Sequence, residues 1–294
     1  ESHDGDAPFF MNLNFYSVHT PIQAPAERVA PYETKREALG LDDVQEFAVG
    51  GRFPTEHKRD GRIERRLVQS NPTYAAMVES VDRAVGRLLD ALDRTDQLDD
   101  TVVVFTADNG GLATAEGSPT CNSPLSEGKG WMDEGGNRVP FLAWGPGVES
   151  GVCTEPVTSP DVYPTVLDLA GVDTPDDQVV DGESLTGLFA GDDALDREAI
   201  YWHYPHYGNQ GGTPAGAVRR GDWKLVEFFE DDHVELYDLD ADVREETDLS
   251  EHRPGVVADL RTDLAEWREA VDALLPEENP DFEGWPDRAG AGSR

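Results

Sequence analysis

Three stretches of the chain carry the apolar spacing of a helix with one buried face. The longest runs from Pro72 to about Leu98, where apolar residues recur at intervals of three and four. These residues are Tyr74, Met77, Val78, Val81, Val85, Leu88, Leu89 and Leu92. Asp161 to Ala170 predicts a short second helix, and Gly255 to Leu275 predicts a closing amphipathic one.

Uninterrupted apolar runs predict buried strands in the first two thirds of the chain. Pro8 to Val18 is apolar and rich in aromatic residues, Thr101 to Ala107 is rich in β-branched residues, and Val139 to Trp144 is a third run. Continuous runs of this kind are typical of strands covered on both faces. Their alternation with helices predicts an α/β fold with a doubly wound, mostly parallel sheet over residues 1–195.

The pattern changes after about Asp196, where the apolar runs become short and turn residues separate them. The runs are Ala199 to Tyr204, Ala215 to Arg220, Trp223 to Phe229 and His233 to Tyr237. Turn pairs such as Gly221-Asp222 indicate antiparallel hairpins. Residues 196–275 are therefore expected to form a small antiparallel sheet with one helix, and residues 276–294 a loose tail.

The stretch from Gln23 to about Asn71 has weak periodicity, and it holds a cluster of basic residues. The cluster consists of Arg52, Lys58, Arg59, Arg62, Arg65 and Arg66. Two interpretations remain open: a solvated loop, or a rim that attracts an anionic substrate.

The charge of the chain excludes some partners. It has 24 Lys and Arg against 60 Asp and Glu, a formal net charge of −36, yet 38 % of its residues are hydrophobic. That apolar content predicts a folded, acid-coated protein, and its field repels nucleic acid and anionic membranes. Because lysine is scarce among the basic residues, the composition favours a halophilic protein stabilised by molar salt over an ordinary acidic one.

Cysteine and hydropathy constrain the chain further. Cys121 and Cys153 are the only cysteines, too few for a disulfide framework or a cysteine-rich zinc site. Two lone thiols are favoured, with pairing left open. No apolar run approaches 18 residues, which predicts no membrane span. The first residues resemble neither an initiator methionine nor a signal peptide, so the chain is expected to begin within a longer protein.

Chemically capable residues follow the ends of the predicted strands, where open α/β sheets place their functional crevice. His19 follows the first strand, Asp108 and Asn109 follow the second, and Lys129 precedes the third. Asp108 and Asn109 offer the hard oxygen donors that suit Ca²⁺ or Mg²⁺. The alternative for this pair is an Asp-Asn-Gly turn that ends the strand.

The remaining candidates are a lysine and three histidines. Lys129 lies between Gly128 and Gly130, which allow close backbone approach, so it is either an anion contact or a solvent-facing loop residue. His19 is either structural or a contact and proton donor for an anionic oxygen. His203 and His206 lie in the aromatic segment 201–207, which predicts either a substrate wall or a buried strand with its exit turn.

Five segments in this order resemble the sulfatase family of the alkaline-phosphatase superfamily. They are PFFMNLNFYSVHTPIQAP, TVVVFTADNGG, PLSEGKGWMDEGGNRVPFLAWGPGV, SPDVYPTVLDLAGV and GDWKLVEFFEDDHVELYDLDADVREETDLS. The resemblance extends from about Pro8 to about Leu274. It implies the alkaline-phosphatase-like fold and hydrolysis of a sulfate ester carried by a small molecule or a carbohydrate.

The resemblance also implies residue roles. Asp108 and Asn109 would be two ligands of a calcium ion that orients the sulfate group. Lys129 and His19 would contact that group during catalysis, and His203 and His206 would line the pocket that selects the alcohol. The nucleophile of the family is the hydrated aldehyde of a formylglycine made from Cys or Ser.

The chain departs from the family pattern at the nucleophile. The formylglycine motif reads Cys or Ser, any residue, Pro or Ala, any residue, Arg, and the segments that begin at Cys121 and Cys153 do not fit it. A missing N-terminal portion, or an oligomer, is therefore expected to complete the site, and the chain alone is expected to be inactive. The alternatives are a phosphoric-ester or phosphonate hydrolase of the same superfamily and a truncated, non-catalytic chain that binds sulfated glycans.

Overall fold

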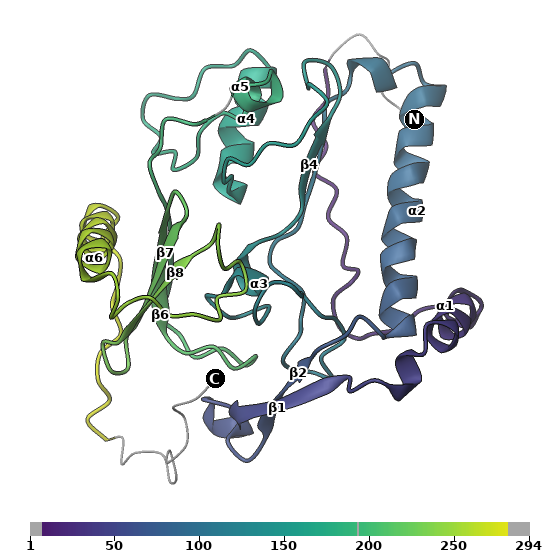
Figure 1. Ribbon diagram of the computed structural model, residues 1–294. Coiled ribbons are helices and arrows are strands. Elements are labelled where there is room, and N and C mark those ends of the chain that lie inside the picture. The colour runs from purple at the N-terminus through teal and green to yellow at the C-terminus, as the bar shows by residue number, and fades with distance from the viewer. Residues whose placement is uncertain (1–7, 193, 282–294) are drawn as a thin grey trace. The chain divides into compact units, whose positions relative to one another are not determined.

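The computed structural model describes residues 8–192 and 194–281 (Figure 1). The chain divides into two units. Each unit is assembled from several segments of the sequence. The first contains Glu1–Val29, Thr73–Asp108 and Pro140–Glu198. The second contains Ala30–Pro72, Asn109–Val139 and Ala199–Arg294. Part of the tail expected over residues 276–294 lies outside the described residues.

The main elements among the described residues of the first unit are a long helix, a pair of strands and two short α-helices. They are α2 (Pro72–Arg94), β3 (Val103–Thr106), β4 (Phe141–Trp144), α4 (Val162–Leu169) and α5 (Thr186–Phe189). α2 confirms the long amphipathic helix, with Pro72 at its start, where proline is well tolerated. β3 and β4 confirm the strands predicted within Thr101 to Ala107 and Val139 to Trp144. α4 confirms the short helix predicted within Asp161 to Ala170.

Two expectations for the first unit are wrong. Pro8 to Val18 is not a buried strand: residues 8–16 have no regular secondary structure, and Phe10 and Tyr16 are 70 % and 72 % exposed. β3 and β4 pair antiparallel, with Val103 opposite Trp144, and all other strand pairs of the described residues are antiparallel as well. The mostly parallel sheet is therefore not observed. An apolar run becomes a strand only where a neighbour takes up its backbone hydrogen bonds, and its composition does not specify that neighbour.

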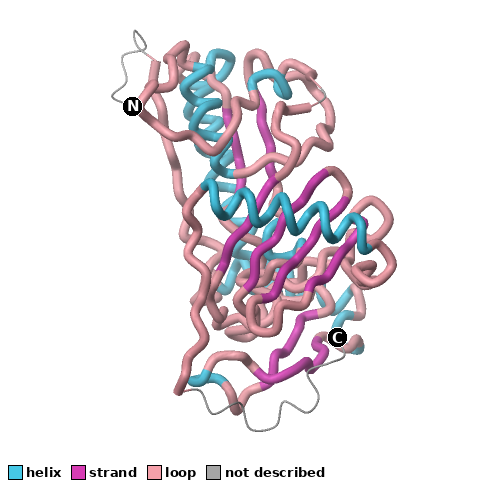
Figure 2. The backbone as a smooth tube through the Cα atoms, turned by 90° about the vertical axis from the view of Figure 1, so that its left-hand side faces the viewer, coloured by secondary structure: helices cyan, strands magenta, loops and turns pink. Residues whose placement is uncertain are grey.

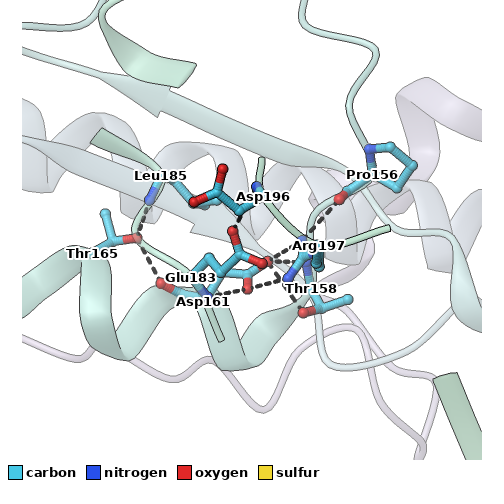
Figure 3. A network of polar contacts seen from close by, with 8 residues as sticks. All are labelled: Pro156, Thr158, Asp161, Thr165, Glu183, Leu185, Asp196 and Arg197. Carbon is cyan, nitrogen blue, oxygen red and sulfur yellow. Dashed lines mark hydrogen bonds and ion pairs between the residues drawn. The ribbon is translucent and has the colours of Figure 1, made fainter. Parts of the chain in front are cut away.

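A buried carboxylate organises the loops around α4 in the first unit (Figure 3). Asp161 is fully buried and accepts hydrogen bonds from the Thr158 and Glu183 amides at 2.6 and 2.9 Å. Arg197 donates to both carboxylate oxygens, at 2.5 and 2.7 Å. Burial alone would raise the pKa of Asp161, but the Arg197 hydrogen bonds and the two amides hold that pKa below its usual value.

The second unit contains a four-stranded antiparallel sheet with a helix across one face (Figure 2). The strand order is β5 (Ile200–Tyr204), β6 (Ala215–Arg220), β7 (Trp223–Phe228) and β8 (Val234–Asp238), followed by α6 (Pro254–Ala270). This arrangement confirms the antiparallel sheet and closing helix that the short apolar runs predict. Gly221, at φ 59°, allows the tight turn between β6 and β7.

Side-chain alternation gives this sheet two different buried faces. Toward α6, Val218, Leu225 and Leu236 pack against Leu260 and Leu264. Each of these fully buried side chains contributes roughly 2 kcal/mol by its removal from water.

The face of the sheet opposite α6 includes two small residues of β6, Ala215 and Ala217. There, Ala215, Ala217 and Val226 pack against Met132, which lies three residues after Lys129. Alternate positions along β6 and β7 therefore point to two faces, one covered by α6 and one that supports the segment around Met132.

The remaining elements of the second unit come from the middle of the chain. They are β1 (Phe47–Arg52) and β2 (Arg62–Arg66), which form an antiparallel hairpin, and the short helix α3 (Glu134–Asn137). The helix α1 (Ala26–Ala38) begins in the first unit and continues in the second. The weakly periodic stretch from Gln23 to Asn71 thus folds into a helix and a hairpin.

Cys121 and Cys153 are both free thiols, as favoured by the sequence. Over the described residues, the helices are too short or too polar to traverse a bilayer.

Raising the KCl concentration from 0.2 to 3 M is expected to raise the melting temperature by about 5 °C or more. Only four acidic side chains are buried among the described residues, so nearly all of the acidic charge lies at the surface. Salt screens the mutual repulsion of these surface charges. Calorimetric scans in KCl, with sorbitol of equal osmolality as control, measure the effect. A melting temperature that stays flat or falls would favour an ordinary acidic protein.

Candidate functional site

Two loops of the second unit are joined by backbone hydrogen bonds, and they carry Asn109 and Lys129. The Lys129 amide donates to the Gly111 carbonyl at 3.1 Å, and the Gly110 amide donates to the Gly136 carbonyl at 2.9 Å. Asn122 strengthens the junction, because its side-chain amide donates to the Gly111 carbonyl at 2.8 Å and to the Glu127 carbonyl at 2.9 Å, and its oxygen accepts from the Gly111 amide at 3.1 Å. The loop after β3 and the lysine loop, defined here as residues 126–137, therefore form one rigid piece.

Glycines make this close approach possible. A Cβ atom at Gly110 would lie 1.7 Å from the Gly135 carbonyl oxygen, and one at Gly128 would lie 2.3 Å from the Gly111 carbonyl oxygen. A Cβ atom at Gly136 would lie 2.2 Å from the Trp131 carbonyl oxygen. The glycines that flank Lys129 and Asn109 thus serve backbone packing.

The structure brings together part of the predicted site. Asn109 and Lys129, both half-buried, belong to the joined loops of the second unit. Asp108 is exposed at the last position of a first-unit segment, and its chain neighbour Asn109 begins the next segment of the second unit. His19 is exposed in the first unit, where its Nδ1 hydrogen-bonds to the Thr20 carbonyl oxygen at 2.9 Å.

A segment after β5 packs beside Lys129, and the sequence analysis missed it. The Gln210 carbonyl accepts hydrogen bonds from the Thr114 hydroxyl at 2.8 Å and from the Trp131 indole at 3.1 Å. A Cβ atom at Gly212 would lie 2.0 Å from the Gly130 carbonyl oxygen. The signal available in the sequence was the glycine-rich run of residues 208–212, which allows another backbone to come close.

The predicted basic cluster contains two arginines that hold the structure together. Arg65 donates to the Glu127 carboxylate at 2.6 and 2.7 Å, and its guanidinium lies 5.6 Å from the Trp131 ring centroid. Arg66 is buried and hydrogen-bonds to Ser70 at 2.6 Å. Arg52, Arg59 and Arg62 remain exposed on the hairpin. A substrate rim can therefore draw only on these three and Lys58 within the cluster.

The two histidines of the aromatic segment differ in their surroundings. His203 on β5 is half-buried, its Nε2 is 2.8 Å from the Leu274 carbonyl oxygen, and its ring lies against Phe229. His206 is exposed, with its ring edge toward Tyr204. These contacts fix His203 within the fold of the second unit, and the pocket roles of both histidines stay predictions.

A buried charge cluster lies on the face of the sheet that supports the lysine loop. Lys224 of β7 is fully buried and donates to Glu134 at 3.0 Å and to Glu245 at 2.9 Å. Burial alone would lower the pKa of Lys224, but Glu245 and Glu134 outweigh it and raise that pKa.

The two carboxyls of this cluster titrate differently. Burial raises the pKa of Glu245 to about 7, an effect that Lys224 only partly opposes and nearby Asp133 adds to. Burial would also raise the pKa of Glu134, but Lys224, Arg219 and Arg138 together hold that pKa below its usual value. Glu245 is therefore the group of the cluster that gains a proton first as the pH falls.

The donors after β3 fit calcium in kind. Asp108 offers a carboxylate, and Asn109 offers an amide oxygen, because its amide nitrogen donates to the Gly110 carbonyl at 2.9 Å. Ca²⁺ takes six to eight oxygens. Over the ranges 8–192 and 194–281, no group of three or more His, Cys, Asp or Glu residues is placed to hold a metal ion. The calcium-ligand role of Asp108 and Asn109 stays a prediction.

Two family models match the chain, and together they span most of it. The model described as sulfatase matches residues 1–172. The model described as N-sulphoglucosamine sulphohydrolase, C-terminal, matches residues 128–270. The two matches overlap over residues 128–172, which include residues 128–137 of the lysine loop. The second match also includes the sheet β5–β8 with α6.

Curated proteins and solved structures agree with these matches. A sulfatase of Formosa agariphila is 32 % identical over 269 residues, which is 85 % of this chain and 43 % of that protein. A choline-sulfatase of Rhizobium meliloti is 29 % identical over 92 % of this chain and 53 % of that protein. The crystal structure of Ps i-CgsB in complex with k-i-k-neocarrahexaose has 28 % identity and a TM-score of 0.65, covering 85 % of this chain and 48 % of that one. The chain therefore spans about half the length of these relatives.

Proposed function

Because the chain belongs to the sulfatase family, we propose that it supplies the sulfate-binding lysine, a histidine and two calcium ligands of a sulfuric ester hydrolase. The observation that carries the proposal is the rigid junction of the two loops in the second unit. It holds Lys129 and Asn109 in one piece through the contact between the Lys129 amide and the Gly111 carbonyl. A lysine and an amide-oxygen metal ligand carried on one joined backbone would suit an anionic sulfate group.

Lys129 and His19 act on the sulfate group in this proposal. The Lys129 ammonium contacts a sulfate oxygen and offsets the negative charge that develops on the transferring group. His19 uses its Nδ1 toward the Thr20 carbonyl, so its Nε2 is the nitrogen that contacts the sulfate and protonates the leaving alcohol oxygen.

Calcium and the nucleophile complete the proposed site. Asp108 and Asn109 would hold Ca²⁺, which as a Lewis acid orients and polarises the sulfate oxygens. The nucleophile of the family, a hydrated aldehyde, would come from a formylglycine. Because no Cys or Ser of the chain begins the formylglycine motif, we propose that a segment outside this chain supplies the nucleophile and the remaining carboxylate ligands, and that the chain alone is inactive.

A sulfated carbohydrate is the proposed substrate class. The solved neighbours include complexes with k-i-k-neocarrahexaose and with D-glucosamine-2-N,6-O-disulfate. In this chain, His206, Tyr204 and Tyr207 form an exposed group at and after the end of β5. Aromatic and imidazole groups with polar tips are suited to contact sugar rings and hydroxyls.

Lys129→Ala is expected to lower sulfate-ester turnover by about 10²- to 10³-fold, because one charge-stabilising contact is lost. The assay uses 4-nitrophenyl sulfate and sulfated disaccharides, first with the chain alone and then with the chain joined to the N-terminal half of the Formosa agariphila relative. Turnover is expected only for the joined protein, and EDTA is expected to abolish it. Lys35→Ala is the matched control, since Lys35 is an exposed lysine of the same unit.

Three results would contradict this proposal. Turnover by the chain alone would show that it contains its own nucleophile. Equal activity of Lys129→Ala and Lys35→Ala would show that Lys129 does not contact the sulfate group. A joined protein that prefers phosphate esters, or that binds sulfated glycans without turnover, would point to a phosphoric-ester hydrolase or to a non-catalytic glycan-binding chain.

A further inference from the structure

The turn after β8 contains Arg244 and Glu245, and it contacts the lysine loop near both ends of that loop. At the start of the loop, the Ser126 hydroxyl donates to the Arg244 carbonyl. Near its far end, the Glu134 amide donates to the Glu245 carboxylate at 2.7 Å. Lys129 lies between these two attachment points, so the turn brackets the segment that carries it.

Lys224 ties this turn to the sheet. Its position on β7 shares a face with Val226, the face that packs against Met132 of the lysine loop. Its ammonium hydrogen-bonds to Glu245 of the turn and to Glu134 of the loop. Since all three side chains are buried, removal of the ammonium would leave two carboxylates without their shared cation.

We propose that Lys224, Arg244 and Glu245 form a clasp that positions the lysine loop. Lys224 is thus a positioning residue that acts through Lys129, and this role rests on the proposed function of Lys129. Apart from Trp131 and Met132, the lysine loop consists of glycine, serine, asparagine and charged residues, so it needs such external attachments to keep one conformation. The clasp supplies one attachment at each end of the loop and anchors both to a strand of the sheet.

The charges around Glu245 make the clasp sensitive to pH. Lys224 faces it from β7, Glu134 and Asp133 face it from the lysine loop, and Arg219 of β6 and Arg138 face Glu134. A carboxyl whose pKa is higher in the closed state than in the open state stabilises the closed state while it carries its proton. For Glu245 this stabilisation is complete below the ordinary pKa of 4.5, and it is lost as the pH rises through about 7. Opening of the loop should therefore become more frequent between pH 4.5 and 7 and level off above.

Hydrogen exchange resolved by peptides, on the full chain in molar KCl, tests the clasp without any need for turnover. Lys224→Met and Glu245→Ala are expected to accelerate exchange of residues 126–137 by at least about tenfold, while strand β6 stays protected. Ser126→Ala should produce a smaller acceleration of the same segment. Arg197→Met is the matched control, because it removes a half-buried cation from the first unit and should leave residues 126–137 unchanged.

The pH profile of the unmodified chain provides a test that no folding defect can obscure. After correction for intrinsic exchange rates, opening of residues 126–137 should rise about tenfold or more between pH 4.5 and 7, and Glu245→Gln should remove this dependence. Equal acceleration of β6 and the lysine loop in both variants, or a flat pH profile in the unmodified chain, would overturn the proposal. Failure of the sulfatase assay alone would leave these exchange results in place.

Discussion

Replacement of Asp161 by asparagine is expected to lower the free energy of unfolding of the first unit by about 3 kcal/mol. Asp161 is fully buried and accepts hydrogen bonds from Arg197 and from the Thr158 and Glu183 amides (Figure 3). Asparagine keeps one acceptor oxygen but turns an amide toward the guanidinium, so Arg197 loses its counter-charge. Hydrogen exchange of residues 158–170 and 183–190 in increasing urea measures the loss.

A double-mutant cycle separates this ion pair from the amide contacts. Arg197→Met alone leaves the carboxylate with its two amide donors, and the double variant removes both charges. The combined loss is expected to be at least 1 kcal/mol smaller than the sum of the single losses, because contacting residues are coupled. A purely additive result, or a loss below about 1 kcal/mol for Asp161→Asn, would mean that the pair contributes little.

Acid should erase the defect of Asp161→Asn. The pKa of Asp161 is lowered in the folded state, so the stability it contributes is present above the unfolded value of 3.8. That contribution is lost as the pH falls through the lower, folded value. The two proteins should therefore differ fully at pH 6 and converge in strong acid, as the same exchange measurement can show.

The antiparallel sheet was predictable because its signals are local. Residues 215–220 form β6 as the sequence predicts, and the Gly221-Asp222 pair forms the turn into β7. The run from Pro8 to Val18 has stronger apolar character, yet residues 8–16 of the structure form no strand. A strand needs a partner, and partners distant in sequence leave no trace in the local pattern. The direction of pairing between β3 and β4 was hidden for the same reason.

The candidate site was predictable where backbone geometry needs glycine. Lys129 became a candidate through its flanking glycines, and the structure shows that the backbone does approach closely there, while the role of its ammonium stays a prediction. Gln210 was missed because it acts through its carbonyl oxygen, which every residue carries. Lys224 lies two residues before Val226 and therefore on the same inward face of β7. It was missed because a lysine in a strand is usually solvated.

Gly110→Ala is the second substitution with a large expected effect, a loss of about 3 kcal/mol in the second unit. The added Cβ atom would lie 1.7 Å from the Gly135 carbonyl oxygen and 2.7 Å from the Gly135 carbonyl carbon. Both are backbone atoms, so no side-chain rotation can relieve the contact. The loop after β3 must then separate from the lysine loop, which breaks the hydrogen bond from the Gly110 amide to the Gly136 carbonyl.

Gly51→Ala is the matched control, because Gly51 belongs to the same unit and a Cβ atom there meets nothing within 4 Å. Urea unfolding monitored by hydrogen exchange should detect the loss for Gly110→Ala and less than about 0.5 kcal/mol for Gly51→Ala. In the joined protein, Gly110→Ala should also reduce turnover about as strongly as Lys129→Ala, since it moves Asn109 away from the lysine. Full stability with unchanged turnover would mean that the two loops are not the rigid piece on which sulfate binding depends.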